Sequence, residues 1–249
     1  MNSEQGGLHL LLFFCFVGLV LQPEGATGKI ARNTIISEGR ERSYYLFVPK
    51  PVPAAPAPLI VTLHGSGRNG RILLENWKSL AQKEGIILAG PDALNPAFWG
   101  MPADGPAFIC ALVEALKTKY PVHPGRVYLF GHSAGASFAI LLALMESEYF
   151  AAAAVHAGSL ARENYHVLDY AKRKTPISIF VGTNDPLFPL PIVRETREAL
   201  LGRGFSVQLT EIPGHNHNYY SRAGEINRDA WEFLRKQDLG ANPFYKKYP

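Results

Sequence analysis

The sequence predicts an α/β fold in which a mainly parallel, twisted β-sheet is covered by helices on both faces. Short runs of Val, Ile and Leu alternate along the chain with segments of helical periodicity, and these runs lie at 59–63, 86–89, 126–130 and 177–181. Near-continuous apolar strands are typical of parallel sheets that are buried on both faces. In such sheets ligands bind beyond the carboxyl ends of the strands, so we look for functional residues in the loops that follow strands.

The first predicted elements are a β-hairpin and a helix. Residues 34–37 and 42–48 are two strands joined by a glycine turn. Residues 50–58 contain four prolines, which predicts a stiff surface loop of polyproline type. Residues 72–82 have helical spacing, and Gly85 ends that helix.

The remaining elements continue the alternation of strands and helices. The strand at 126–130 is followed directly by a small-residue and leucine-rich helix at 136–145. The other predicted elements are helices at 105–120, 192–201 and 226–236 and strands at 151–155 and 205–212.

Length and charge limit the classes of function. The 249 residues, of which 47% are hydrophobic and 18% charged, predict a single globular domain over 29–249. The net charge is +4, and the longest run of Lys and Arg is the triplet at 172–174. A chain without a basic stripe is not expected to bind nucleic acid.

The N-terminus predicts a targeting segment. Residues 8–21 are almost wholly apolar but too short to span a membrane comfortably, and small residues precede Lys29. We predict that 1–28 form a signal peptide, with an N-terminal anchor as the alternative, because Glu4 and the lack of Lys or Arg before the apolar run depart from the usual pattern. The mature protein would then be secreted or periplasmic, without stable membrane insertion. Cys110 would be its only cysteine, so no intrachain disulfide could form.

The most informative motif is Gly-His-Ser-Ala-Gly at 131–135, which lies between a predicted strand and a predicted helix. A serine in this context is typical of a nucleophile elbow, a turn so sharp that glycines must flank the serine. We therefore predict that Ser133 is a nucleophile.

An elbow serine needs a base to take its proton and a carboxylate to orient the base. Where such an elbow carries the nucleophile, the acid and then the histidine follow later in the chain. Asp185 comes directly after the strand at 177–181 and is the predicted acid, whereas Asp169 and Glu211 do not clearly follow a strand end.

The loop after the last predicted strand contains two histidines, His215 and His217, and either could be the base. A His-x-His pair also raises the possibility of metal binding, but no cysteine or carboxylate cluster accompanies it. We expect neither a metal nor an organic cofactor.

The motifs together resemble those of the α/β-hydrolase superfamily, and specifically compact bacterial esterases that are polyhydroxybutyrate-depolymerase-like or feruloyl-esterase-like. The likeness covers about 30–237 and implies a hydrolase domain without a large lid. Residues 214–220, Gly-His-Asn-His-Asn-Tyr-Tyr, also look like the Gly-Tyr-Asp-His-Ser-Tyr-Tyr run of esterase D, an S-formylglutathione hydrolase. In that run the histidine before small-Tyr-Tyr is catalytic, so the resemblance implies His217 as the base. It places His215 at a variable position of the same loop, where we expect its side chain to help bind the substrate.

A second set of residues is expected to stabilise an oxyanion. His-Gly-Ser-Gly at 64–67 follows a predicted strand, where this fold carries its second oxyanion donor. The predicted donors are the backbone N–H groups of Ala134 and Ser66, with Gly67 as the alternative to Ser66. The imidazole of His64 is expected to brace this loop, and His132 and His156 are expected to be structural.

Trp99 lies in the loop after the strand at 86–89, on the expected ligand edge. It could contact an acyl or aryl group of the substrate, or it could only pack on the surface of a long loop.

These residues predict a serine carboxylester hydrolase that works through an acyl-enzyme on a small-molecule or polymer-derived ester. The alternatives are a serine peptidase or acyltransferase on the same fold, or a non-catalytic binding protein on a hydrolase scaffold. The acyl and alcohol groups of the substrate and the oligomeric state do not follow from the sequence.

Overall fold

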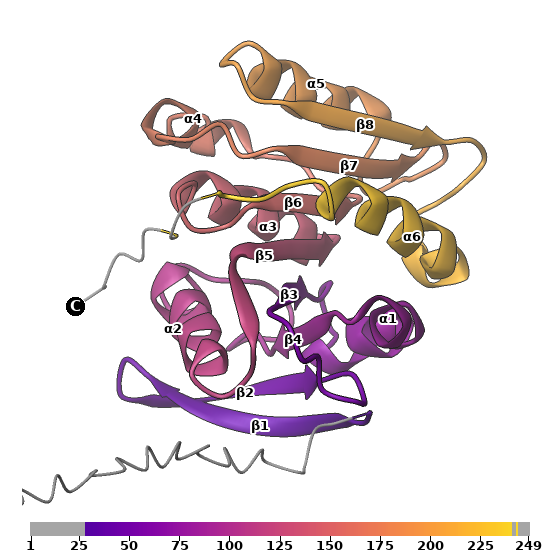
Figure 1. Cartoon of the computed structure of the whole chain (residues 1–249). Coiled ribbons are helices and arrows are strands. Elements are labelled where there is room, and N and C mark those ends of the chain that lie inside the picture. Colours follow the sequence, from indigo (N-terminus) through magenta and orange to yellow (C-terminus); the bar gives the residue numbers. More distant parts are fainter. Residues whose placement is uncertain (1–27, 241–242, 244–249) are drawn as a thin grey trace, which may run out of the picture.

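The computed structural model describes residues 28–240 and Pro243, so the predicted leader lies outside the described residues apart from Gly28. One eight-stranded sheet runs through the molecule in the order β1-β2-β4-β3-β5-β6-β7-β8 (Figure 1). The strands from β3 to β8 run parallel to one another. Strand β2 pairs antiparallel with both of its neighbours, β1 and β4. The predicted mainly parallel α/β fold is confirmed.

The elements agree closely with the predicted ones. The strands are β1 (Ile30–Ser37), β2 (Arg40–Phe47), β3 (Ala57–Leu63), β4 (Ile87–Pro91), β5 (Val122–His132), β6 (Ala152–His156), β7 (Ile177–Gly182) and β8 (Val207–Ile212). The helices are α1 (Gly70–Glu84), α2 (Pro106–Lys117), α3 (Ala134–Met145), α4 (Val167–Tyr170), α5 (Leu190–Leu201) and α6 (Ala223–Leu234), with 3₁₀ turns η1 (Arg162–Asn164) and η2 (Tyr219–Ser221). The sequence did not predict α4, η1 or η2, because three or four residues are too few to show a helical period.

The predicted hairpin is present at one edge of the sheet. Strands β1 and β2 pair from Ile30 opposite Phe47 to Ser37 opposite Arg40. The two turn residues both have positive φ angles, as a tight two-residue hairpin turn requires. Strand β2 then pairs with β4, which attaches the hairpin to the parallel part of the sheet.

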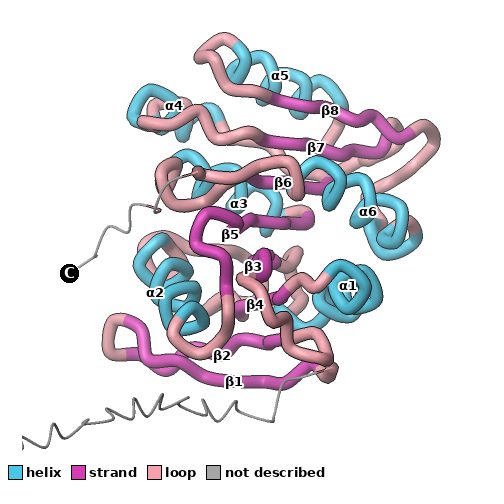
Figure 2. Tube along the Cα trace, in the orientation of Figure 1, coloured by secondary structure: helices cyan, strands magenta, loops and turns pink. Residues whose placement is uncertain are grey.

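Helices cover the sheet on both faces, with α1 and α6 on one face and α2, α3, α4 and α5 on the other (Figures 1 and 2). Side chains of the central strand β5 alternate between the two layers: Val127 and Leu129 belong to one apolar cluster, and Tyr128 and Phe130 belong to the other. All four are fully buried. Burial of each such side chain contributes about 1.5–3 kcal/mol, so both layers stabilise the strand that carries the elbow.

Two glycines allow α3 to begin directly behind β5. A Cβ atom on Gly135 would lie 2.0 Å from the carbonyl oxygen of Leu63, and one on Gly131 would lie 2.3 Å from the carbonyl oxygen of Gly135. Both distances are far below van der Waals contact, so the turn between β5 and α3 requires glycine at both positions.

None of the described helices is long and apolar enough to cross a membrane.

We expect Gly135→Ala to lower the free energy of unfolding by about 1–3 kcal/mol, because its methyl group must displace the β3 backbone. The midpoint of thermal unfolding should fall by roughly 5 °C. Gly224→Ala is the matched control: Gly224 is a helical glycine of α6 with open space where its Cβ would lie. This control should leave stability unchanged or raise it by up to about 1 kcal/mol. Equal unfolding midpoints for the two variants would contradict the packing argument.

Candidate active site

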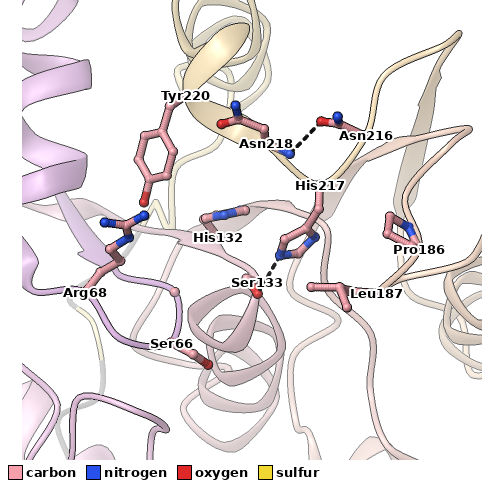
Figure 3. A pocket seen from close by; sticks show the side chains of 11 residues that line it. Ser66, Arg68, His132, Ser133, Pro186, Leu187, Asn216, His217, Asn218 and Tyr220 are labelled. Atoms are coloured by element: carbon pink, nitrogen blue, oxygen red, sulfur yellow. Dashed lines mark hydrogen bonds between the residues drawn. The ribbon is translucent and has the colours of Figure 1, made fainter.

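Ser133 occupies the turn between β5 and α3 in a conformation that is rare for a residue with a side chain. Its φ is 58° and its ψ is −121°. Its backbone N–H donates to the carbonyl oxygen of His156, at 3.0 Å, at the end of the neighbouring strand β6. Such a conformation costs on the order of 1–3 kcal/mol, and the close packing of β5, β6 and α3 maintains it. The result is a hydroxyl group that faces a surface pocket (Figure 3).

The structure brings Ser133, His217 and Asp185 into one hydrogen-bonded line. His217 Nε2 lies 2.9 Å from Ser133 Oγ (Figure 3), and His217 Nδ1 lies 2.9 Å from Asp185 Oδ2. Because a carboxylate only accepts, Nδ1 carries the proton, and Nε2 is left to accept the serine O–H. This is the arrangement in which the imidazole can act as a base toward the hydroxyl.

Asp185 is held rigidly behind the histidine. Its side chain is 0% exposed, and its Oδ1 accepts the backbone N–H groups of Leu187 and Phe188, both at 2.9 Å. The ring of Phe188 lies parallel to the imidazole of His217, with 5.7 Å between the ring centroids. The carboxylate and the aromatic ring together restrict the orientation of the imidazole.

The two weaker acid candidates lie elsewhere. Glu211 forms a two-pronged ion pair with Arg194, and Asp169 pairs with Arg203, both on exposed surface. Neither is among the residues that line the pocket beside Ser133.

Two backbone N–H groups near Ser133 are free to bind an oxyanion. The N–H groups of Ala134 and Ser66 have no hydrogen-bond partner among the described residues. The N–H of Gly67, the alternative to Ser66, donates to the carbonyl oxygen of Pro96 at 2.7 Å and is therefore occupied. A Cβ on Gly65 would be 3.3 Å from Ser133 Cβ, so the loop that carries Ser66 packs tightly against the elbow.

His64 and Trp99 brace this loop. The Nδ1–H of His64 donates to the carbonyl oxygen of Gly65 at 2.9 Å, and its Nε2 accepts the N–H of Ala93 at 3.1 Å. The indole N–H of Trp99 donates to the carbonyl oxygen of His64 at 2.8 Å, and its ring stacks on Phe138. Trp99 was predicted to contact the substrate or to pack on a long loop; the contacts with His64 and Phe138 agree with packing, and Trp99 is not among the residues that line the pocket.

The pocket beside Ser133 has a volume of about 580 Å³. Its lining differs on the two sides of the Ser133–His217 pair: Arg68 and Tyr220 lie on one side, and Pro186 and Leu187 lie on the other (Figure 3). No motif in the sequence indicated that these four residues line the pocket. Their positions close to Ser66, His217 and Asp185 in the chain were the only available signal. The full lining is Gly65, Ser66, Arg68, His132, Ser133, Pro186, Leu187, Asn216, His217, Asn218 and Tyr220.

Arg68 and Tyr220 offer hydrogen-bond donors that the described residues do not use. The guanidinium of Arg68 forms no ion pair with any residue of the described chain, and its central carbon lies 5.8 Å from the centre of the Tyr220 ring. The Tyr220 hydroxyl is buried without a hydrogen-bond partner in that same part of the chain, and it points toward Arg68 (Figure 3). Burial raises the pKa of Tyr220, so the phenol keeps its proton at neutral pH.

His215 does not have the position that the resemblance implied. It is 6% exposed, is absent from the pocket lining, and its Nε2 lies 3.2 Å from Nε2 of His156. The interpretation of His215 as a substrate-binding residue is therefore wrong: the loop turns this side chain toward the end of β6. Its neighbours Asn216 and Asn218 line the pocket instead.

His132 and His156 are buried beside the site and uncharged. Burial, with the nearby His217, lowers the pKa of His132 to about 4. Burial, with the neighbouring His132 and His215, lowers the pKa of His156 to about 2. Their Nδ1 atoms lie 3.1 Å apart, which two neutral imidazoles permit when one donates and the other accepts.

Residues 28–240 contain no group of three or more His, Cys, Asp or Glu side chains that could hold a metal ion. Cys110, the free cysteine of the described chain, is buried in the apolar layer between α2 and the sheet, and burial raises the pKa of its thiol.

Comparison with known proteins agrees with this geometry. The model of the dienelactone hydrolase family matches residues 93–235, a span that includes Ser133, Asp185 and His217. The chain belongs to the dienelactone hydrolase family. It therefore has the α/β-hydrolase fold that the sequence resemblance implied.

Individual relatives are distant. The bifunctional acetylxylan esterase/xylanase of Neocallimastix patriciarum is 26% identical over 152 residues, which are 59% of this chain but 22% of that enzyme. The chain thus spans about a fifth of that relative's length. An S-formylglutathione hydrolase from Agrobacterium tumefaciens superposes with a TM-score of 0.69 at 17% identity, covering 84% of this chain and 95% of its own. A ferulic acid esterase from Anaeromyces mucronatus superposes with a TM-score of 0.66 at 17% identity, covering 81% and 89%. These two similarities show the fold.

We expect the free energy of unfolding to fall as the pH drops below about 6.5. The folded pKa values of His132 and His156 lie below the unfolded value near 6.5, so in this range the unfolded chain binds protons that the folded chain does not. Each histidine then lowers stability by up to about 1.4 kcal/mol per pH unit. Urea unfolding between about pH 7 and pH 4.5 measures this slope. His156→Gln should make it shallower by about one proton, and an unchanged slope would contradict the assignment.

Proposed function

We propose that this protein is a serine hydrolase of carboxylic esters that works through an acyl-enzyme. The observation that carries the proposal is the line from Ser133 Oγ to His217 to the buried Asp185, with both hydrogen-bond distances at 2.9 Å. Membership of the dienelactone hydrolase family supports a hydrolytic activity. The esterase activity named for the acetylxylan relative supports an ester as the substrate.

In the proposed reaction, Ser133 Oγ attacks the ester carbonyl while His217 Nε2 takes the hydroxyl proton. His217 then donates this proton to the leaving alcohol, which leaves an acyl group on Ser133. Water repeats the sequence: His217 takes its proton, the acid is released, and the serine hydroxyl is restored. Asp185 stabilises the imidazolium that forms in each half.

The backbone N–H groups of Ser66 and Ala134 would bind the oxyanion of each tetrahedral intermediate. Both are free in the described chain, and both belong to segments that packing holds in place. One such donor contributes on the order of 3 kcal/mol of transition-state stabilisation.

For the substrate we propose a small or polymer-derived carboxylic ester. We also propose that the enzyme is secreted or periplasmic, on the basis of the apolar run at 8–21 and the small residues that precede Lys29.

Ser133→Ala should reduce hydrolysis of short p-nitrophenyl esters on the order of a million-fold, as in other serine triads. His217→Ala should be nearly as damaging, because it removes the base, whereas His215→Ala should lose much less. Steady-state kinetics and labelling by a fluorophosphonate probe measure these effects. Substantial activity in Ser133→Ala, or a larger loss in His215→Ala than in His217→Ala, would overturn the assignment.

The two sides of the pocket favour an ester that is polar at one end and apolar at the other. Arg68 presents a cation that forms no ion pair within the described residues, a donor that a carboxylate prefers, and the buried hydroxyl of Tyr220 points toward it. On the other side Leu187 is 65% exposed and offers an apolar surface. We therefore propose that the enzyme favours esters that carry a carboxylate within reach of Arg68.

We expect kcat/KM for a carboxylated ester to exceed that for its neutral methyl ester by about two- to fivefold, as a partly exposed ion pair allows. Arg68→Gln should abolish this preference, and Tyr220→Phe should reduce it. Hemiesters of dicarboxylic acids place the charge on the acyl side, and acetoxybenzoate places it on the alcohol side, so the two series identify which side Arg68 serves. Arg71→Gln is the control, because Arg71 pairs with Glu75 outside the pocket. An unchanged preference in Arg68→Gln would refute the proposal.

A further inference from the structure

Three buried histidines form a hydrogen-bonded chain beneath the candidate active site, which we call the histidine chain: His132, His156 and His215. The Nδ1 atoms of His132 and His156 lie 3.1 Å apart, and the Nε2 atoms of His156 and His215 lie 3.2 Å apart. The three side chains belong to residues that are 5%, 0% and 6% exposed. His156 is therefore the central link, and it uses both of its ring nitrogens within the chain.

The histidine chain touches every segment that carries a residue of the proposed triad. His132 immediately precedes Ser133, and the carbonyl oxygen of His156 accepts the Ser133 N–H. His215 lies two residues before His217. The carbonyl oxygen of His215 accepts the N–H of Asn184, the residue before Asp185, at 2.9 Å.

The segments are also joined through their backbones, and the N–H of Gly214 in the base loop donates to Thr183 Oγ1 in the acid loop at 2.8 Å. The Cβ that Gly182 lacks would lie 2.1 Å from the carbonyl oxygen of His215, so the acid loop and the base loop are in backbone contact there. The backbone of β6 links the elbow to β7, because the N–H of Ser133 donates to His156 and the N–H of Ala157 donates to Phe180 at 2.8 Å. Among the side chains beneath the pocket, the hydrogen bond between His156 and His215 links the base loop to β6, and the rings of His217, Tyr219 and Tyr220 pack against His132. Stacking allows sliding in the ring plane, whereas a hydrogen bond restricts both distance and direction.

The chemistry of neutral imidazole makes His156 difficult to replace. A neutral imidazole has one N–H and one lone pair, so His156 must donate through one nitrogen and accept through the other. A side chain that lacks either function leaves a buried nitrogen of a neighbour unpaired, which destabilises that arrangement. The base loop can avoid this cost by moving away from the elbow, and a shift of about 1 Å between reacting groups can cost on the order of a hundredfold in rate.

We propose that His156 is a positioning residue, which sets the distance between Ser133 and His217 by linking the elbow to the base loop through the histidine chain. This inference rests on the proposed function. His156 is fully buried and absent from the pocket lining, so it acts through the two catalytic segments and not on the substrate.

The experiment compares two substitutions of His156 in the full chain. His156→Leu removes both ring nitrogens at similar volume, and His156→Gln keeps one donor and one acceptor. We expect His156→Leu to lower kcat for p-nitrophenyl acetate by about 10- to 100-fold, with KM within about threefold of wild type. The rate of fluorophosphonate labelling should fall in parallel, and His156→Gln should recover most of both losses.

Thr175→Val is the matched control for loss of a buried hydrogen bond. Thr175 is 0% exposed, lies just before β7 at the edge opposite the site, and donates through Oγ1 to the carbonyl oxygen of Ser147 at 3.2 Å. It should keep kcat within about twofold of wild type. If His156→Leu does not fold, His215→Leu and His215→Gln break and restore the same chain from the loop side, with the same expected pattern.

A folded leucine variant with kcat within twofold of wild type would overturn the proposal, as would an equal loss in Thr175→Val or no recovery in the glutamine variant. These outcomes differ from failure of the proposed function, in which the wild-type protein itself would neither hydrolyse esters nor react with the probe.

Discussion

The left-handed backbone of Ser133 is the constraint on which the rest of this site depends. A residue with a Cβ adopts φ 58° only where the surrounding packing compensates for the strain. Here β5 is buried on both faces, and α3 starts within one residue of its end because Gly131 and Gly135 allow the backbones to approach. The sharp turn raises the serine hydroxyl above the sheet and leaves the N–H of Ala134 without a partner among the described residues. One backbone feature thus supplies both the proposed nucleophile and one proposed donor for the oxyanion.

The parallel sheet supplies the remaining groups, because its strands all end at the same edge. The loop after β3 provides Ser66, the loop after β7 provides Asp185, and the loop after β8 provides His217. Proximity alone does not align three side chains from separate loops. Alignment comes from hydrogen bonds at the base of the site: two backbone N–H groups on Asp185, the brace of His64 on the oxyanion loop, and the links through the histidine chain.

The histidines beneath the pocket are neutral, whereas Arg68 in the pocket lining is charged. The imidazoles beneath the pocket are buried, and their lowered pKa values keep them neutral at physiological pH. A neutral neighbour does not oppose the positive charge that His217 acquires during the proposed reaction. The unpaired charge of the pocket lies instead on Arg68 at one side of the nucleophile, where a substrate can reach it. The pocket is therefore polar on one side, at Arg68 and Tyr220, and apolar on the other, at Pro186 and Leu187.

The sequence by itself determined the order and type of the strands and of the longer helices, because buried strands and amphipathic helices leave periodic patterns that do not depend on distant contacts. It also placed Gly-His-Ser-Ala-Gly between a strand and a helix, and it placed Asp185 just after a strand, as the structure has them. Only the tertiary structure decided the directions of side chains within loops. His215 and His217 lie two residues apart and have the same chemistry, yet one is buried against His156 and the other reaches Ser133. The N–H of Gly67, the alternative to Ser66, donates to Pro96, and the indole N–H of Trp99 donates to His64. Both contacts are long-range, so no local sequence pattern indicates them.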